Sequence, residues 1–193
     1  MEPVSITLRV QEIMGLYQKF GNEDYIGEPV SQIEHMCQCA DLARESGADD
    51  EVILAAFFHD IGHLFAFEFP ETELANMDGN GIADHEKLGG DYLRSRGFSE
   101  KIARLVQSHV QAKRYLTFKF PEYLDQLSEA SIKTLEFQGG VMSAEEAASF
   151  ESDPLCEKYV QLRRWDEQAK IVGKPLSALD QYEKMILAHL ERQ

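Results

Sequence analysis

An apolar run that ends in two imidazoles and a carboxylate restricts how this chain can fold. Residues 52–58 read VILAAFF, and HDIGH follows directly, so His59, Asp60 and His63 continue a segment with the composition of a protein core. A buried carboxylate without a partner is strongly unfavourable or takes up a proton. The fold must therefore supply Asp60 with a cation, a hydrogen-bond network or a metal ion.

Apolar residues recur at helical spacing along the chain, and no alternating strand pattern of useful length interrupts them. We expect an all-α helical bundle that forms a single domain over residues 1–193, because this length suits one hydrophobic core. The expected helices cover residues 5–20, 31–46, 50–66, 84–96, 99–116, 121–138, 143–149, 154–170 and 177–192.

Capping residues and glycines set the expected ends of these helices. Ser31 with Glu34 reads as a capping box, as does the stretch SAEE at 143–146. Gly62 is the expected stop of the third helix. Residues 67–83 contain a proline and two glycines and are predicted to form a long ordered loop or lid.

The formal net charge of −15 is spread along the chain and disfavours nucleic acid as a partner, because nothing here would release counterions from a phosphate backbone. No run approaches about 18 apolar residues and the start lacks a secretion signal, so we expect a cytoplasmic protein without a membrane partner. Cys37, Cys39 and Cys156 form no CxxC pair and are expected to be reduced core thiols. An anionic substrate would require a local basic patch.

A single histidine is most often a core or surface residue with ordinary hydrogen bonds. A group of five close together in the sequence favours a metal site instead. These five fall within one 75-residue span, on or beside predicted helices: His35, His59, His63, His85 and His109. A metal ion bound by these imidazoles would also stabilise Asp60. The donor set lacks thiolates and suits iron, manganese or a catalytic zinc. His189, in the polar C-terminal helix, is expected at the surface.

Neighbouring side chains on a regular helix diverge by about 100°. His59 and Asp60 can therefore share an ion only if the helix end is distorted, or if Asp60 bridges two ions. Gly62 favours such a distortion. The sequence predicts a metal site but leaves both arrangements open at this point.

The order of these residues resembles the HD-domain superfamily, an all-helical, metal-dependent family with the pattern H…HD…D. His35 matches the first histidine, His59-Asp60 the tandem pair and Asp166 in RRWDE the distant aspartate. His85 and His109 match the further histidines of members with two metal ions. Most relatives hydrolyse phosphoesters, whereas a minority are di-iron oxygenases.

Further stretches are similar to the oxygenase branch that cleaves organophosphonates, the PhnZ and TmpB type. In that branch a tyrosine matching Tyr25 closes over the iron before substrate enters, and a glutamate matching Glu28 meets the amino end of the substrate. The same resemblance implies that His63, Lys113, Ser131 and Arg163 contact the phosphonate and hydroxyl groups or move protons. These residues lie in the stretches YIGE, HDIGH, HVQAK, ASIK and RRWD.

The residues agree with part of this resemblance. Lys113 lies at i+4 from His109 and Arg163 at i−3 from Asp166, so each cation shares a helix face with a predicted ligand. Together they would form the basic patch that an anion requires in an acidic protein. Taken singly, either residue is most often a solvated surface charge.

The resemblance implies a mixed-valence Fe(II)/Fe(III) pair. His35, His59 and Asp166 would hold one iron and His85 and His109 the other, with Asp60 between them. O2 would be the co-substrate, and a 1-hydroxyphosphonate would be cleaved to a carboxylate and phosphate. The two substrates considered are 2-amino-1-hydroxyethylphosphonate, which gives glycine, and its N-trimethyl analogue, which gives glycine betaine.

The trimethylated substrate is slightly favoured because Phe65, Phe67 and Phe69, with Glu68, can offer aromatic faces and negative charge to a quaternary ammonium. A hydrophobic helix end packed on the core explains the same rings and is the commoner case for each of them. The sequence alone therefore leaves the head group open.

Three alternatives remain. A metal-dependent HD phosphohydrolase would use a metal-bound water on a small phosphomonoester or nucleotide. A non-catalytic HD module would sense a nucleotide or a metal. A polyol oxygenase similar to myo-inositol oxygenase would share the di-iron ligands, although Lys113 and Arg163 suit an anion better.

Overall fold

The computed structural model describes residues 5–25, 27–69, 77 and 81–193. Within these residues the chain is helical, and the one extended contact is an isolated bridge between Asp24 and Ser31. The expected all-α fold class is confirmed. Within the same ranges no helix is long and apolar enough to cross a membrane.

The regular elements of the described residues are α-helices and two 3-10 turns. Their bounds are α1 (Ile6–Phe20), α2 (Gln32–Glu45), α3 (Asp50–Phe58), η1 (Ile61–Leu64), α4 (Phe65–Glu68), α5 (His85–Ser95), α6 (Glu100–Lys119), η2 (Pro121–Gln126), α7 (Glu129–Phe137), α8 (Ala144–Glu151), α9 (Cys156–Gln168) and α10 (Leu179–Leu190).

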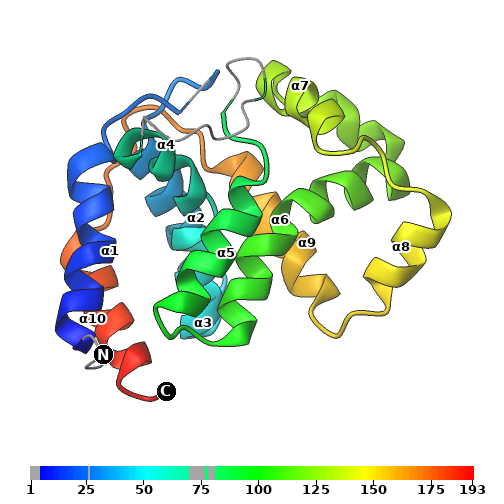
Figure 1. The fold of residues 1–193 in the computed structure, drawn as a ribbon. Coiled ribbons are helices and arrows are strands. Elements are labelled where there is room, and N and C mark those ends of the chain that lie inside the picture. Colours follow the sequence, from blue (N-terminus) through cyan, green and yellow to red (C-terminus); the bar gives the residue numbers. More distant parts are fainter. Residues whose placement is uncertain (1–4, 26, 70–76, 78–80) are drawn as a thin grey trace.

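Helices α2, α3, α5, α6 and α9 form the centre of the molecule, and α1 and α10 lie side by side against one edge of it (Figure 1). The apolar run of α3 is buried here: residues from Leu54 to Phe58 have no exposed surface. Tyr17 and Tyr182, from α1 and α10, stack on either side of this segment through Phe57, with ring centroids 4.4 and 4.2 Å away. Chain segments distant in sequence thus bury the apolar part of α3.

A smaller part of the molecule, with α7 and α8, lies on the other side of α6 and α9 (Figure 1). Its own apolar cluster contains Tyr115, Leu116, Tyr123, Leu127, Met142 and Ala147. Arg114 ties this part to α6, because its guanidinium donates hydrogen bonds to the carbonyls of Gly140 (2.8 Å) and Gly139 (3.3 Å). Gly139 and Gly140 both adopt positive φ, a conformation that favours glycine.

Most helix ends agree with the sequence. Both expected capping boxes are present, Ser31 with Glu34 at α2 and Ser143 with Glu146 at α8. Ser99 caps α6, which continues three residues beyond the expected end at 116 and stops at Lys119. Side-chain oxygens thus satisfy backbone N–H groups that have no partner within the helix.

The helix expected at 50–66 is wrong in its extent. α3 ends at Phe58, Asp60 has φ −106° and ψ 12°, and the chain continues as the 3-10 turn η1. Gly62 therefore does not stop the helix. A Cβ at Gly62 would lie 2.0 Å from the backbone oxygen of His85, so this glycine allows the start of α5 to approach η1. The distortion expected between His59 and Asp60 is present.

Two other expectations are corrected. Residues 121–138 form two elements, η2 and α7, because Ser128 caps a new helix through a hydrogen bond from the backbone N–H of Ser131. His189 is 2% exposed instead of lying at the surface. It stacks on Phe98, and its Nε2 accepts a hydrogen bond from the backbone N–H of Ser99 at 3.2 Å.

The cysteines are free thiols, as expected, with Cys37 and Cys39 in the core and Cys156 only half-buried. Burial raises the pKa of Cys37 to about 12, so this thiol stays protonated and inert. Most of the loop expected at 67–83, namely residues 70–76 and 78–80, lies outside the described residues.

Candidate metal centre and substrate cavity

Four buried histidines come from four different segments, and the backbone orients each ring in the same way. They are His35 on α2, His59 directly after α3, His85 at the start of α5 and His109 within α6. Their Nδ1 atoms lie 3.0 Å from Ala169 O, 2.8 Å from Ala56 O, 3.1 Å from Ile82 O and 2.7 Å from Val106 O, respectively. Because a carbonyl only accepts, each Nδ1 carries the hydrogen and each Nε2 presents its lone pair.

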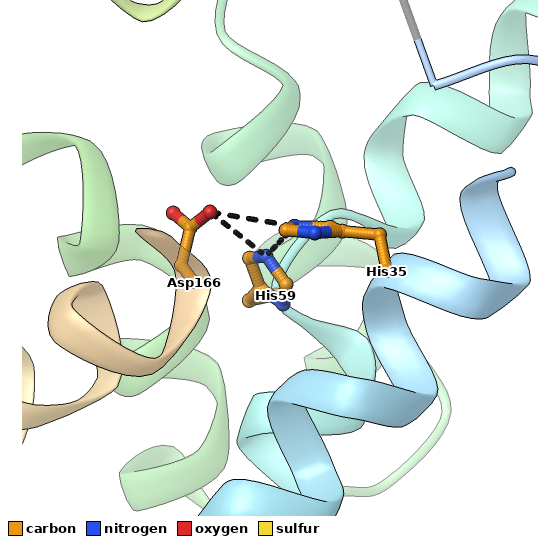
Figure 2. A group of neighbouring side chains, drawn as sticks. All are labelled: His35, His59 and Asp166. Carbon is orange, nitrogen blue, oxygen red and sulfur yellow. Dashed lines mark hydrogen bonds and ion pairs between the residues drawn. The ribbon is translucent and has the colours of Figure 1, made fainter. Parts of the chain in front are cut away.

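The first group of donors is His35, His59 and Asp166, whose side chains converge from three elements (Figure 2). The two Nε2 atoms are 3.0 Å apart, and Asp166 Oδ1 lies 3.3 Å from His35 Nε2 and 3.9 Å from His59 Nε2. All three residues are at most 2% exposed.

The second group is His85 and His109, whose Nε2 atoms are 3.1 Å apart. Both lie 3.3 Å from Oδ1 of Asp60, while Oδ2 of the same carboxylate lies 3.5 Å from Nε2 of His35 and of His59. The two oxygens of Asp60 therefore face different histidine pairs.

This donor set fits metal ions. Two Nε2 lone pairs 3.0 Å apart repel each other unless a proton or cation lies between them, and Asp166 Oδ1 is buried without a hydrogen-bond partner among the residues described. Ligand atoms about 2.1 Å from one ion stand roughly 3 Å apart. The spacing and orientation of the donors thus match coordination better than a network of hydrogen bonds.

Both carboxylates are held in the charged form. Burial raises their pKa values, but His59, His109 and His85 hold the pKa of Asp60 well below its usual range. Burial also raises the pKa of Asp166, but Arg163, followed by His35, holds it well below its usual range. An ionised carboxylate is the protonation state that a metal ion requires of these two side chains.

His63 lies next to the second group. Its ring stacks on that of His85 with centroids 3.9 Å apart, and its Nδ1 accepts a hydrogen bond from the backbone N–H of Ile82 at 3.4 Å. The hydrogen is therefore on Nε2. Burial and the neighbouring His85 hold the pKa of His63 well below 6.5, so the ring is neutral near pH 7. His63 also lies close enough to Asp60 and His85 to share an ion with them.

A cavity opens on one side of these donors and contains two cations. Lys113 and Arg163 line it together with Asp60, His63 and Asp166, and are only 3% and 5% exposed. Burial and the nearby Arg163 hold the pKa of Lys113 well below 10.5. This is the basic patch that the sequence predicts, and both side chains lie where the helical spacing indicates.

The N-terminal part of α7 lines the same cavity and contacts both cations. Lys113 Nζ donates hydrogen bonds to Thr134 Oγ1 (2.9 Å) and Ser131 O (3.3 Å). Arg163 reaches Ser131 Oγ at 3.5 Å and Tyr123 OH at 3.2 Å, and it also pairs with Asp166. The hydroxyls and cations together form a surface suited to a tetrahedral anion.

Tyr25 and Glu28 line the cavity from the segment before α2. The ring of Tyr25 stacks on His35, with centroids 4.1 Å apart and planes 13° apart. Burial raises the pKa of Tyr25 well above 10, and the negative charge of Asp60 adds to this effect. Glu28 Oε1 pairs with Lys170 Nζ at 2.8 Å and accepts a hydrogen bond from Ser128 Oγ at 2.5 Å.

The phenylalanines expected to offer faces to a quaternary ammonium do not line this cavity. Phe65 is 8% exposed and packs in the core, Phe67 stacks on Phe20 with centroids 5.9 Å apart, and Phe69 is exposed. Glu68 pairs with Lys19 instead. The alternative, a hydrophobic helix end packed on the core, is correct for Phe65 and Phe67, whereas Phe69 is exposed.

The structure adds cavity residues that sequence reasoning missed, among them Gln32, Thr134 and Gln138. Thr134 lies one helical turn after Ser131, so its position was available once Ser131 was placed on a helix. Gln32 precedes His35 by one turn in the same way. Lys170, which holds Glu28, comes from a segment 142 residues away and has no comparable sequence signal.

Comparisons with known proteins place residues 33–191 within the HD domain family. Protein L432 of Acanthamoeba polyphaga mimivirus, an uncharacterised protein, is 45% identical over 185 residues, which cover 96% of this chain and 83% of the relative. A 1-hydroxy-2-(trimethylamino)ethylphosphonate dioxygenase (glycine-betaine-forming) of Leisingera caerulea is 43% identical over 161 residues, 83% of this chain and 80% of the relative. A hydroxymethylphosphonate dioxygenase of Gimesia maris is 37% identical over 186 residues, 95% of this chain and 89% of the relative.

Proposed function

The chain belongs to the HD-domain family, and from this premise we propose that it is a di-iron oxygenase that cleaves the C–P bond of a 1-hydroxyphosphonate. The observation that carries the proposal is the cavity that Lys113 and Arg163 line together with the candidate metal ligands Asp60 and Asp166. Relatives with 43% and 37% identity are named as dioxygenases of such substrates. The substrate proposed is 2-amino-1-hydroxyethylphosphonate or its N-trimethyl analogue.

Six side chains would hold two iron ions. His35, His59 and Asp166 would hold one ion, His85 and His109 the other, and Asp60 would bridge them through its two oxygens. Support comes from the 3.0 and 3.1 Å separations within the two histidine pairs. We leave His63 outside this set because its Nδ1 accepts the backbone N–H of Ile82. The Nε2 atoms of His85 and His109, in contrast, both lie 3.3 Å from Asp60 Oδ1. Bound iron supplies the one-electron chemistry with O2 that breaking a C–H and a C–P bond requires.

The cations would bind the phosphonate and align the substrate with the donors. Lys113 and Arg163 offer charge and N–H groups, and the hydroxyls of Ser131 and Thr134 add donors next to them. Both cations are almost completely buried and therefore have little contact with bulk water. Low exposure strengthens each charged hydrogen bond to the anion.

Tyr25, Glu28 and His63 would act at the other groups of the substrate. Tyr25 covers His35 and would have to move for a substrate to approach that side. Glu28 would face the cationic head group. His63 would donate or transfer a proton through Nε2, since that nitrogen carries the hydrogen in the neutral ring.

The reaction consumes one O2 for each phosphate released, since a 1-hydroxyphosphonate plus O2 balances to a carboxylate and inorganic phosphate. Simultaneous measurement of O2 uptake and phosphate release with the two candidate substrates tests the proposal. A one-to-one ratio is expected, and release should stop under strict anoxia. Phosphate release that continues without O2 would identify a hydrolase instead, and turnover of neither substrate class with less than one metal ion per chain would indicate a sensing module.

A further inference from the structure

Gln32 is a buried residue of the cavity for which the proposed reaction has no use so far. It is the first residue of α2 and lines the cavity, as Tyr25 and Glu28 do. Its side chain is 2% exposed. The amide nitrogen Nε2 donates a hydrogen bond to the backbone oxygen of Asp24 at 3.2 Å.

The amide oxygen of Gln32 has no hydrogen-bond partner among the described parts of the chain, although it is buried. The orientation of the amide is fixed, because the carbonyl of Asp24 accepts hydrogen bonds and cannot donate one to Oε1. Buried acceptors are nearly always satisfied, and an exception requires an explanation. A hydrogen-bond donor on the bound substrate would explain why Oε1 of Gln32 has no partner.

The chemistry around Gln32 indicates which part of the ligand that donor belongs to. The anion-binding groups Lys113 and Arg163 already have partners on α7 and α9. Glu28, another acceptor of this lining, shares its Oε1 with Lys170 and Ser128. The Oε1 atom of Gln32 is thus an uncommitted neutral acceptor in the lining that also contains Glu28, the residue expected to face the head group.

The two candidate head groups differ in this property. A primary ammonium offers three N–H donors, whereas a trimethylammonium offers none and is recognised by aromatic faces. Among the described lining residues, Tyr25 is the one aromatic ring besides histidines, and Phe65, Phe67 and Phe69 lie elsewhere. A site with an unpaired acceptor discriminates against an analogue that lacks the donor.

We propose that Gln32 is a specificity-determining residue that accepts a hydrogen bond from the head group through Oε1 and so favours an N–H-bearing ammonium over a trimethylammonium. This inference rests on the proposed function. It differs from the preference that the sequence alone suggests, because the rings behind that preference do not line the cavity.

Two substitutions separate the acceptor from the contact with Asp24. Gln32→Met keeps the length of the side chain and removes both the acceptor and the N–H donor. Gln32→Glu removes the donor to Asp24 as well but keeps an acceptor oxygen. Both variants lose the contact with Asp24, and Gln32→Glu also adds a negative charge. The amine and the trimethylated substrate are both cationic, so a difference between the variants in the ratio of these two substrates reports the acceptor oxygen.

The assay measures kcat/KM of the iron-loaded enzyme with 2-amino-1-hydroxyethylphosphonate, its N-trimethyl analogue and hydroxymethylphosphonate, which has no head group. The wild type should prefer the primary amine to the trimethylated substrate. In Gln32→Met the ratio of amine to either other substrate should fall about 10- to 100-fold, mainly through KM, the loss typical of a hydrogen bond to a charged group. Gln32→Glu should keep the preference. Anaerobic calorimetry should show the same change in dissociation constants.

Gln38→Met is the matched control, because Gln38 is the other buried glutamine of α2 and uses both ends of its amide on Ile171, at 2.9 and 3.0 Å. It should lower stability without changing the substrate ratios. If the wild type prefers the trimethylated substrate, or if the ratios are unchanged in Gln32→Met, the role of Gln32 is overturned but the proposed function is not. No O2-dependent phosphate release from any of the three substrates would overturn the proposed function itself.

Discussion

Oδ1 of Asp60 lies 3.3 Å from Nε2 of His85, while the other oxygen of this carboxylate faces the opposite histidine pair. One side chain thus contacts both halves of the candidate metal centre. Its position follows from the break after Phe58, where α3 gives way to a turn and Asp60 leaves helical geometry. A continuous helix through residues 59–62 would direct His59 and Asp60 to different sides.

Asp60→Asn should remove metal from both halves of the centre. The amide replaces one oxygen with an N–H donor, which repels a cation. Metal analysis of the purified variant should give less than one ion per chain, against about two in the wild type.

His109→Ala should lose one ion, because it removes a donor from one half only. Asp41→Asn is the control, since Asp41 is a buried carboxylate that bonds to Ser177 and Tyr182 outside the cavity. Two ions retained by Asp60→Asn would contradict the bridging role.

Lys113→Met should weaken binding of the phosphonate. Loss of a buried charge-assisted hydrogen bond typically removes about 1.5–3 kcal/mol, so KM should rise on the order of 10- to 100-fold with a smaller change in kcat. Lys119→Met is the control from the same helix, because Lys119 is exposed and pairs with Glu151. Steady-state kinetics at saturating O2 provide the measurement. Equal KM values for Lys113→Met and Lys119→Met would show that Lys113 does not hold the substrate.

The rate should also depend on the charge of Lys113 at alkaline pH. Burial and Arg163 hold the pKa of Lys113 well below 10.5, so the ammonium loses its proton at a lower pH than an exposed lysine. The profile of kcat/KM, which reports the free enzyme, should fall as pH rises through this lowered value. Lys113→Arg should keep its charge and lack this decline, because the pKa of a guanidinium exceeds about 12. A decline at the same pH in both proteins would assign it to another group.

His189 should make the fold less stable in mild acid. Burial holds the pKa of this ring below 6.5, and its Nε2 accepts the backbone N–H of Ser99 only when unprotonated. The unfolded chain therefore binds a proton that the folded chain resists, so the free energy of unfolding should decrease as pH falls below 6.5. His189→Gln keeps an acceptor and does not titrate, and urea unfolding at pH 7.5 and 5.5 should show a smaller decrease. An identical pH dependence in the two proteins would contradict this.

Features that depend on neighbouring residues were predictable from the sequence. Capping at Ser31 and Ser143 is local, and the faces occupied by Lys113 and Arg163 follow from helical periodicity within one turn of a ligand. The histidines and Asp60 of the candidate metal centre could be proposed from the sequence because buried imidazoles and carboxylates require partners, whereas Asp166 came from the family resemblance. Their order along the chain, and its resemblance to a known family, gave the grouping.

The errors concern contacts between distant segments. His189 is polar in a polar helix, and only the packing of α10 against Phe98 and Ser99 explains its burial. The direction of Phe67 depends on η1, which brings it to Phe20 rather than to the cavity. The pairing of Glu28 with Lys170 joins residues 142 positions apart, and no local pattern encodes it.

The proposed oxygenase chemistry requires two redox-active ions in one centre. Metal analysis combined with electron paramagnetic resonance, on protein purified in air, tests this directly. We predict about two irons per chain and a mixed-valence di-iron signal that changes when a 1-hydroxyphosphonate is added. A single redox-inactive ion, with no signal and no response to the phosphonate, would contradict the proposed di-iron oxygenase.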